Sequence, residues 1–194
     1  MRTLQRITVT SFLLFIALAV APKRGSADDA APISGERAAM IQQIDAAENE
    51  LLQLADAVPD KKYAWRPGKG VRSVGEVYMH VAGANYFLPT LYGVAPPAGI
   101  DLKTYEASVT EKAKIIDALK TSFAHAKKSI ADAPDGDLTK TVKIFGKDGT
   151  ERDAMMIVVT HAHEHLGQSI AYARMNGVVP PWTAARQAAA ADKK

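Results

Sequence analysis

Apolar residues recur at helical spacing along most of the chain. In the first such segment, Ser34 to Val58, successive apolar positions are alternately four and three residues apart. This is the spacing of one face of an α-helix. The positions are Met40, Ile44, Ala47, Leu51, Leu54 and Val58. The pattern stops at Pro59-Asp60, and it predicts an amphipathic helix that buries this face.

Two further segments show the same periodicity. Ser73 and Glu76 form the sequence signature of a capping box, so the second helix is predicted to begin there. It runs to about Tyr92, and Pro89 is expected to kink its end. Its stripe contains Val77, His80, Ala84, Phe87, Leu88 and Leu91. The third helix follows a crossing rich in Pro and Gly, and its stripe is Ile116, Leu119, Phe123, Ala126 and Ile130.

The last long periodic segment spans about Asp153 to Asn176, and Gly177 stands where a left-handed residue commonly ends a helix. Residues 138–150 precede it and favour a short β-hairpin. Residues 183–194 form a tail rich in Ala and Lys that is expected to fray. Four amphipathic segments with little strand signal predict an all-α fold, a four-helix bundle over residues 28–182.

The first 27 residues have the pattern of an export signal. They contain four basic residues and no acidic ones, and the 15-residue run from Ile7 to Ala21 is apolar apart from hydroxyl side chains. Small residues then lead to a cleavage site predicted after Ala27. Because the run is shorter than the roughly 20 residues of a membrane-spanning helix, we expect a periplasmic or secreted protein. Lys23 and Arg24 lie unusually close to the cleavage site, and an uncleaved anchor is the alternative.

Net charge and composition exclude several classes of binding partner. The whole chain has a formal net charge of +3, but without residues 1–27 it keeps 20 basic and 21 acidic residues, a net charge of −1. No basic stripe interleaved with aromatic residues remains, which argues against nucleic-acid binding. The chain has no Cys. Disulfides, thiolate metal sites and lipid attachment through Cys are therefore excluded, and no stable membrane association is expected after cleavage.

The helical periodicity sorts the five histidines. Each residue of a helix turns by about 100°, so His165 lies about 40° from His161 on the apolar stripe of the fourth helix. His163 falls about 200° from His161, on the solvent side. His80 is centred on the stripe of the second helix, whereas His125 is predicted to be exposed. Three histidines from two helices are thus expected inside one bundle.

These three histidines suggest a metal site. Burying an imidazole without a partner costs a few kcal/mol, and one divalent cation satisfies all three rings. A site of three His with an open coordination position suits Zn²⁺ or Ni²⁺. We therefore predict His80, His161 and His165 as metal ligands, with no catalytic base identified. The alternative is a structural bundle in which these histidines are hydrogen-bonded core residues.

A second motif overlaps this site. Residues His161 to His165 also read H-x-x-E-H, the pattern of inverted zinc peptidases, in which Glu164 would be the general base. The chain is short for a peptidase, and no distal acidic ligand stands out. Proteolysis is therefore a minor alternative, and Glu164 is expected to be an outer or surface carboxylate.

Motifs along the chain resemble the DinB-like superfamily. They are the WRPG run at 65–68, the S-x-x-E-x-x-x-H helix ending at His80, and the H-x₃-H-L-G-Q run ending at Gln168. The resemblance implies a four-helix bundle whose metal is held by three His, at His80, His161 and His165. It also implies that Gln168 can hydrogen-bond a ligand or an outer group, although packing of Gly167 and Gln168 against a neighbouring helix is equally open.

The sequence leaves three classes of function: an enzyme, a binding protein without turnover and a structural bundle. The resemblance implies a metal-dependent transferase or hydrolase acting on an unidentified small molecule. Members of the superfamily that transfer thiols work with bacillithiol or mycothiol in a reducing cytosol, which conflicts with export. A metal- or ligand-binding bundle without turnover is the second hypothesis, and a purely structural bundle is the third. A homodimer is expected only by analogy with similar bundles.

Overall fold

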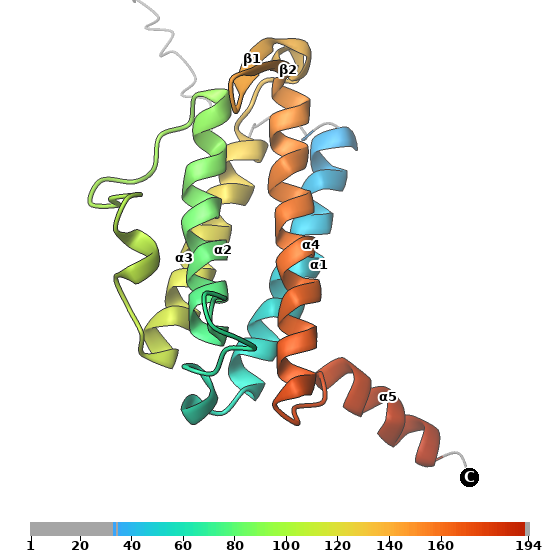
Figure 1. Ribbon diagram of the computed structural model, residues 1–194. Helices are drawn as coiled ribbons and strands as arrows, with labels where there is room; N and C mark the ends of the chain where they lie inside the picture. The colour runs from blue at the N-terminus through green and yellow to red at the C-terminus, as the bar shows by residue number, and fades with distance from the viewer. Residues whose placement is uncertain (1–32, 34, 193–194) are drawn as a thin grey trace, which may run out of the picture. The chain divides into compact units, whose positions relative to one another are not determined.

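Four long helices lie side by side in the computed structural model, which describes residue 33 and residues 35–192 (Figure 1). The predicted export signal at 1–27 lies outside the described residues. The four are α1 (Gly35–Ala57), α2 (Val74–Phe87), α3 (Lys112–Ala131) and α4 (Glu151–Met175), and the shorter α5 (Pro181–Ala191) follows them. Helices α1 and α2 each pack against both α3 and α4. The all-α four-helix bundle is confirmed.

Helix α2 is the most deeply buried of the bundle helices. Eleven of its 14 residues are buried, because it packs against α3, α4 and the short 3₁₀ turn Tyr105–Ala107 together. Its sequence permits this, since Glu76 is the one Asp, Glu, Lys or Arg in the helix. His80 is therefore held on a helix that is packed on several sides.

The helix ends follow the sequence signals. The Ser73 hydroxyl accepts a hydrogen bond from the Glu76 backbone N–H, and the Glu76 carboxylate accepts one from the Ser73 N–H at 2.7 Å. This confirms the capping box. Helix α4 begins at Glu151, slightly before the predicted start, because Thr150 and Asp153 form a second capping box. Gly177 has the expected left-handed backbone, with φ of 75°.

The β-hairpin between α3 and α4 is confirmed. Strands β1 (Thr141–Ile144) and β2 (Lys147–Thr150) pair antiparallel, with Thr141 opposite Thr150. The hairpin lies at one end of the bundle, and α5 follows α4 at the other end (Figure 1).

The structure differs from the predicted elements in several details. Helix α2 ends at Phe87, and Leu88–Tyr92 forms a separate 3₁₀ turn because Pro89 lacks the N–H that would continue the helix. Most of the tail is helix α5, since Ala is the strongest helix former. On α3, Ile115 is fully buried whereas Ile116 is only half-buried.

Among the described residues, no helix combines the length and apolarity needed to cross a membrane.

Candidate metal centre

The bundle brings His80 of α2 together with His161 and His165 of α4. The ring centroid of His80 lies 5.1 Å from that of His161 and 4.7 Å from that of His165, and the two α4 rings are 4.4 Å apart. One nitrogen of each ring lies within 4.8 Å of the other two. The predicted convergence of these three side chains is therefore confirmed, and we call them the histidine triad.

Outer hydrogen bonds orient two rings of the triad. His80 Nδ1 lies 2.7 Å from Glu106 Oε1, and His165 Nδ1 lies 2.7 Å from Gln168 Oε1. Both partners are acceptors, so in the neutral form of each ring Nδ1 carries the proton and Nε2 keeps its lone pair. The Gln168 amide in turn donates to the Tyr172 hydroxyl at 3.1 Å. This arrangement matches the outer hydrogen bonds that orient metal-binding imidazoles.

Lowered pKa values keep two rings of the triad neutral, which suits them to bind a cation. Burial, together with the nearby charges of His165, His80 and Arg72, lowers the pKa of His161 to about 3. Burial also lowers the pKa of His165, against the opposing effect of its hydrogen bond with Gln168. These two rings are therefore neutral at pH 7, which leaves their lone pairs available.

Glu106 provides the negative charge beside the triad. Burial alone would raise the pKa of Glu106, but its bond to His80 and the nearby Arg72 guanidinium hold that pKa below its usual value. The carboxylate is thus ionised at neutral pH and can polarise the Nδ1–H of His80.

The residues present fit a divalent metal ion. His161 Nδ1 is buried without a hydrogen-bond partner within the described part of the chain, and His161 Nε2 lies 3.2 Å from His80 Nε2. Two lone-pair nitrogens at that separation need either a proton or a cation between them. Three neutral imidazole nitrogens form a donor set typical of borderline divalent metals. The triad is therefore a group that can hold a divalent metal.

Three other motif residues on α4 are exposed. His163 is exposed, as predicted, and Glu164 is exposed too. Within the described residues the carboxylate bound to the triad is Glu106, so the geometry does not support the peptidase pattern. Gly167 is also exposed, and a Cβ there would meet nothing within 4 Å, which rules out tight packing at this position.

The prediction that His125 is exposed is wrong. His125 is half-buried on α3, and its ring centroid lies 5.2 Å from that of Tyr86. This side of α3 lies away from its apolar stripe, but Tyr86 of α2 packs on it. Tyr105 of the crossing packs edge-on against Tyr86 with centroids 5.3 Å apart.

Sequence reasoning missed two charged residues at the triad. Glu106 lies in the crossing between α2 and α3, and Arg72 lies in the loop before α2; their side chains form an ion pair at 3.2 Å. The crossing approaches α2 closely at Gly83, where an added Cβ would lie 3.2 Å from Glu106 Cγ. Glycine at 83 was the one available signal, since it lets a neighbouring segment approach a buried helix.

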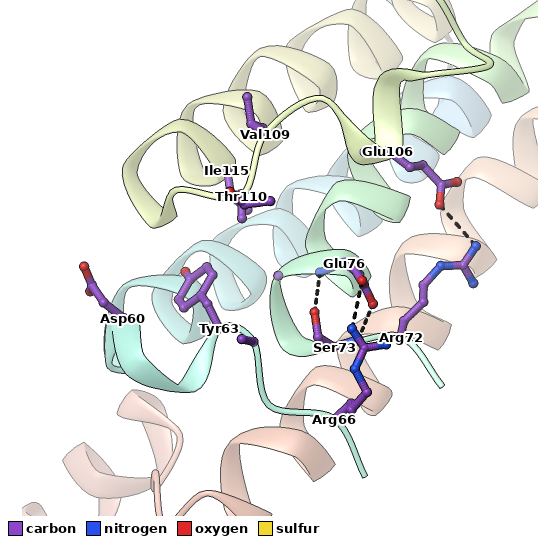
Figure 2. A pocket seen from close by; sticks show the side chains of 13 residues that line it. Asp60, Tyr63, Arg66, Arg72, Ser73, Glu76, Glu106, Val109, Thr110 and Ile115 are labelled. Atoms are coloured by element: carbon purple, nitrogen blue, oxygen red, sulfur yellow. Dashed lines mark hydrogen bonds and ion pairs between the residues drawn. The ribbon is translucent and has the colours of Figure 1, made fainter. Parts of the chain in front are cut away.

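A pocket of about 500 Å³ adjoins this ion pair. Figure 2 shows Glu106 and Arg72 at one end of the pocket, and Asp60 and Tyr63 at the other. The remaining labelled lining residues come from the loop before α2, from the start of α2 and from the crossing into α3: Arg66, Ser73, Glu76, Val109, Thr110 and Ile115.

The fold and the triad define a class, a helical bundle with a histidine cluster between two of its helices. The sequence matches the family model of the DinB superfamily over residues 43–169. The chain therefore belongs to the DinB superfamily, as its motifs indicated. No curated protein sequence matches it significantly.

Solved structures share the fold at low sequence identity. A DinB-like protein from Bacillus cereus ATCC 10987 is 18% identical with a TM-score of 0.64, over 73% of this chain and 93% of that protein. YfiT from Bacillus subtilis, described as a probable metal-dependent hydrolase with an unusual four-helix bundle topology, is 16% identical with a TM-score of 0.58. The match covers 77% of this chain and 93% of YfiT. The DinB-like protein YjoA from Bacillus subtilis is also 16% identical, with a TM-score of 0.58, over 73% of this chain and 93% of that protein.

Proposed function

We propose that this protein is a metal-dependent hydrolase or transferase of small molecules, with His80, His161 and His165 as the ligands of a divalent ion. The observation that carries the proposal is the set of hydrogen bonds that hold Nδ1 of His80 and His165. These bonds leave the Nε2 lone pairs for a shared ion. Zn²⁺ and Ni²⁺ suit three imidazole donors best.

The chain's own residues have separate tasks in this function. The triad binds the ion, Glu106 and Gln168 fix two of its rings, and the buried position of His161 keeps that ring neutral. A divalent ion with an open coordination position lowers the pKa of a water or hydroxyl group that binds there, and so supplies a nucleophile near neutral pH. YfiT, a structural neighbour described as a probable metal-dependent hydrolase, supports hydrolysis.

We also propose that the mature protein acts outside the cytoplasm, because residues 1–27 have the pattern of an export signal. Such a compartment favours hydrolysis over transfer of bacillithiol or mycothiol. The near-neutral mature chain supports a small-molecule substrate over nucleic acid or a membrane surface.

Metal analysis and turnover test the proposal together. We expect about one equivalent of divalent metal per chain when the protein is purified without chelator, and none in His161→Ala. His163→Ala is the matched control, since this histidine is exposed on the same helix. Hydrolysis of 4-nitrophenyl acetate should stop with chelator and return with Zn²⁺ or Ni²⁺. Wild-type protein without near-stoichiometric metal would contradict the proposal.

One observation favours a second candidate, a metal-binding bundle without turnover. Glu106, the carboxylate nearest the triad, is engaged by both His80 and Arg72, so it is poorly placed to accept a substrate proton. Full metal occupancy, with no chelator-sensitive turnover of ester, amide or thiol substrates, would establish this candidate instead.

A further inference from the structure

The pocket beside the Glu106–Arg72 ion pair has the size and lining of a small-molecule site. Its volume of about 500 Å³ falls within the range of ligand pockets, roughly 300–1,000 Å³. Its elements are well anchored: the Tyr63 hydroxyl donates to the Ala55 carbonyl at 2.6 Å, and the start of α2 is held by its capping box. The pocket is thus built by fixed parts of the structure.

The apolar part of the pocket lies away from the triad. Because the Tyr63 hydroxyl is turned toward α1, the aromatic ring contributes an apolar surface to the lining. Val109 and Ile115 add aliphatic surface from the crossing and the start of α3. Figure 2 places these three side chains on the side of the pocket away from Arg72.

The pocket and the triad share a wall. Glu106 Oε1 contacts His80, while Glu106 Oε2 pairs with Arg72, and both Glu106 and Arg72 line the pocket. Arg72 also lies close enough to the triad for its charge to act on His161 and His165. A molecule in the pocket that contacts Arg72 therefore reaches the edge of the metal site.

The charges in the lining identify Arg72 as the position for an anion. Glu76 is engaged by Ser73 and Arg66, and Asp60 pairs with Lys112 at 3.6 Å. Arg66 also donates to the Val71 carbonyl, whereas Arg72 makes one hydrogen bond within the described part of the chain, to Glu106. A guanidinium has five N–H donors in a planar fork, so Arg72 retains donors for a second acceptor.

The proposed metal site strengthens this preference. Three neutral imidazoles contribute no negative charge against that of a divalent ion, so an anionic group nearby is attracted by both the ion and Arg72. We propose that the pocket binds the substrate of this site, a small molecule with an apolar body on Tyr63, Val109 and Ile115 and a carboxylate or similar anionic group on Arg72. This inference rests on the proposed metal-dependent function.

The test compares two ligands of equal size and different charge. The Zn²⁺-loaded protein is titrated with 3-phenylpropionate and with its neutral amide, 3-phenylpropanamide, and binding is followed by backbone amide NMR shifts. We expect the anion to bind about tenfold more tightly, since a charge-assisted hydrogen bond is roughly twice as strong as a neutral one. The shifts should concentrate at pocket residues such as Gly75 and Thr110. Equal affinity for the two ligands would overturn the proposed anionic group.

Substitutions in and near the pocket test whether the ligand binds there. Ala64→Trp fills the pocket from an exposed lining position and should abolish binding, while Arg72→Gln should weaken the anion about tenfold and leave the amide unchanged. Arg72→Lys keeps the charge and should retain part of the preference. Lys69→Gln is the control, because Lys69 is an exposed cation of the same loop outside the pocket lining. Undiminished binding of the anion to Ala64→Trp would show direct ligation to the metal and would refute the pocket.

Metal content of each sample separates this inference from the function on which it rests. A protein that holds stoichiometric metal but does not distinguish the two ligands disproves the pocket proposal alone. A protein that binds 3-phenylpropionate in the pocket but no metal disproves the metal-dependent function instead.

Discussion

Histidines lie on two sides of helix α2, and the two sides differ in what surrounds the rings. On the α4 side, three imidazoles meet, and two of them have their Nδ1 held by acceptors. On the α3 side, His125 packs on Tyr86, and its Nε2 is buried without a partner within the described residues. Burial lowers the pKa of His125 as it does for His161 and His165. Burial of an imidazole therefore does not identify a metal site; the convergence of several nitrogens does.

The two sides are coupled through one short turn. In the 3₁₀ turn Tyr105–Ala107, Tyr105 packs against Tyr86 beside His125, and the next residue, Glu106, binds His80. The aromatic contact on the α3 side thus fixes the carboxylate that orients the triad. The turn Tyr105–Ala107 therefore contributes both to the aromatic packing around Tyr86 and to the candidate metal site.

Removing the metal should have the largest effect and should distinguish the two sides. At free metal about 1,000 times the dissociation constant, binding stabilises the fold by about 4 kcal/mol. For a chain of this size that corresponds to a fall in Tm of about 10 °C on chelation. Differential scanning calorimetry with and without chelator measures this shift.

The matched variants test where the shift originates. His161→Ala should abolish the chelator-dependent change in Tm, whereas His125→Ala should lower Tm slightly and keep that change. A full chelator effect in His161→Ala would show that the metal binds elsewhere.

Gly83→Ala should weaken metal binding without touching a ligand. The added Cβ would lie 3.2 Å from Glu106 Cγ, so the Glu106 side chain must shift by a few tenths of an ångström, and we expect the Glu106–His80 bond to lengthen. Loss of an outer partner of a metal-binding His costs about 10- to 100-fold in affinity. Competition with a chromophoric chelator measures the change.

Gly167→Ala is the control for this substitution. Gly167 follows the triad residues on α4, is exposed, and has open space where a Cβ would project. The change should leave metal affinity unchanged and raise stability by up to about 1 kcal/mol, the difference in helix propensity between Ala and Gly. An equal loss of affinity in both variants would attribute the effect to helix rigidity and not to Glu106.

Glu106→Gln should have a smaller effect, because it keeps an oxygen acceptor for His80 and removes only the charge. We expect metal affinity to fall by up to about tenfold, the low end of the range for outer partners. Glu164→Gln, which alters the exposed carboxylate of the H-x-x-E-H pattern, should leave affinity and turnover unchanged. The reverse result would restore the peptidase interpretation.

The triad was predictable because its geometry follows from helical periodicity. His161 and His165 are one turn apart on a stripe of buried residues, and His80 is central on another, so the angles alone bring them into the core. The capping box at Ser73 and the helix end at Gly177 were predictable for the same reason, since each depends on neighbours within a few residues.

Gln168, three residues from His165, was expected as an outer partner, but Glu106 was not predictable by such local rules. Glu106 and the pocket depend on how a segment without periodicity docks on α2, and that contact joins residues 26 positions apart. The error at His125 also comes from a tertiary contact, since Tyr86 of α2 packs on its ring. Periodicity identifies the face of a helix on which a residue lies, but tertiary contacts decide what covers that face.

The pH dependence of the metal-free protein compares the two sides directly. In the unfolded chain a histidine has a pKa of about 6.5, whereas burial lowers the pKa of folded His161 to about 3 and also lowers that of His125. Between these values the unfolded chain binds a proton that the folded chain does not. Stability is therefore unaffected well above pH 7 and falls as the pH drops below about 6.5.

Urea unfolding between pH 8 and pH 5, with chelator present, measures this slope. His161→Gln should flatten the dependence markedly, because its pKa is strongly lowered by both burial and its two histidine neighbours. His125→Gln should flatten it less, since burial alone acts on that ring. If His161→Gln leaves the slope unchanged, the folded His161 ring binds a proton as readily as it does in the unfolded chain, and its burial beside two other rings has no electrostatic consequence.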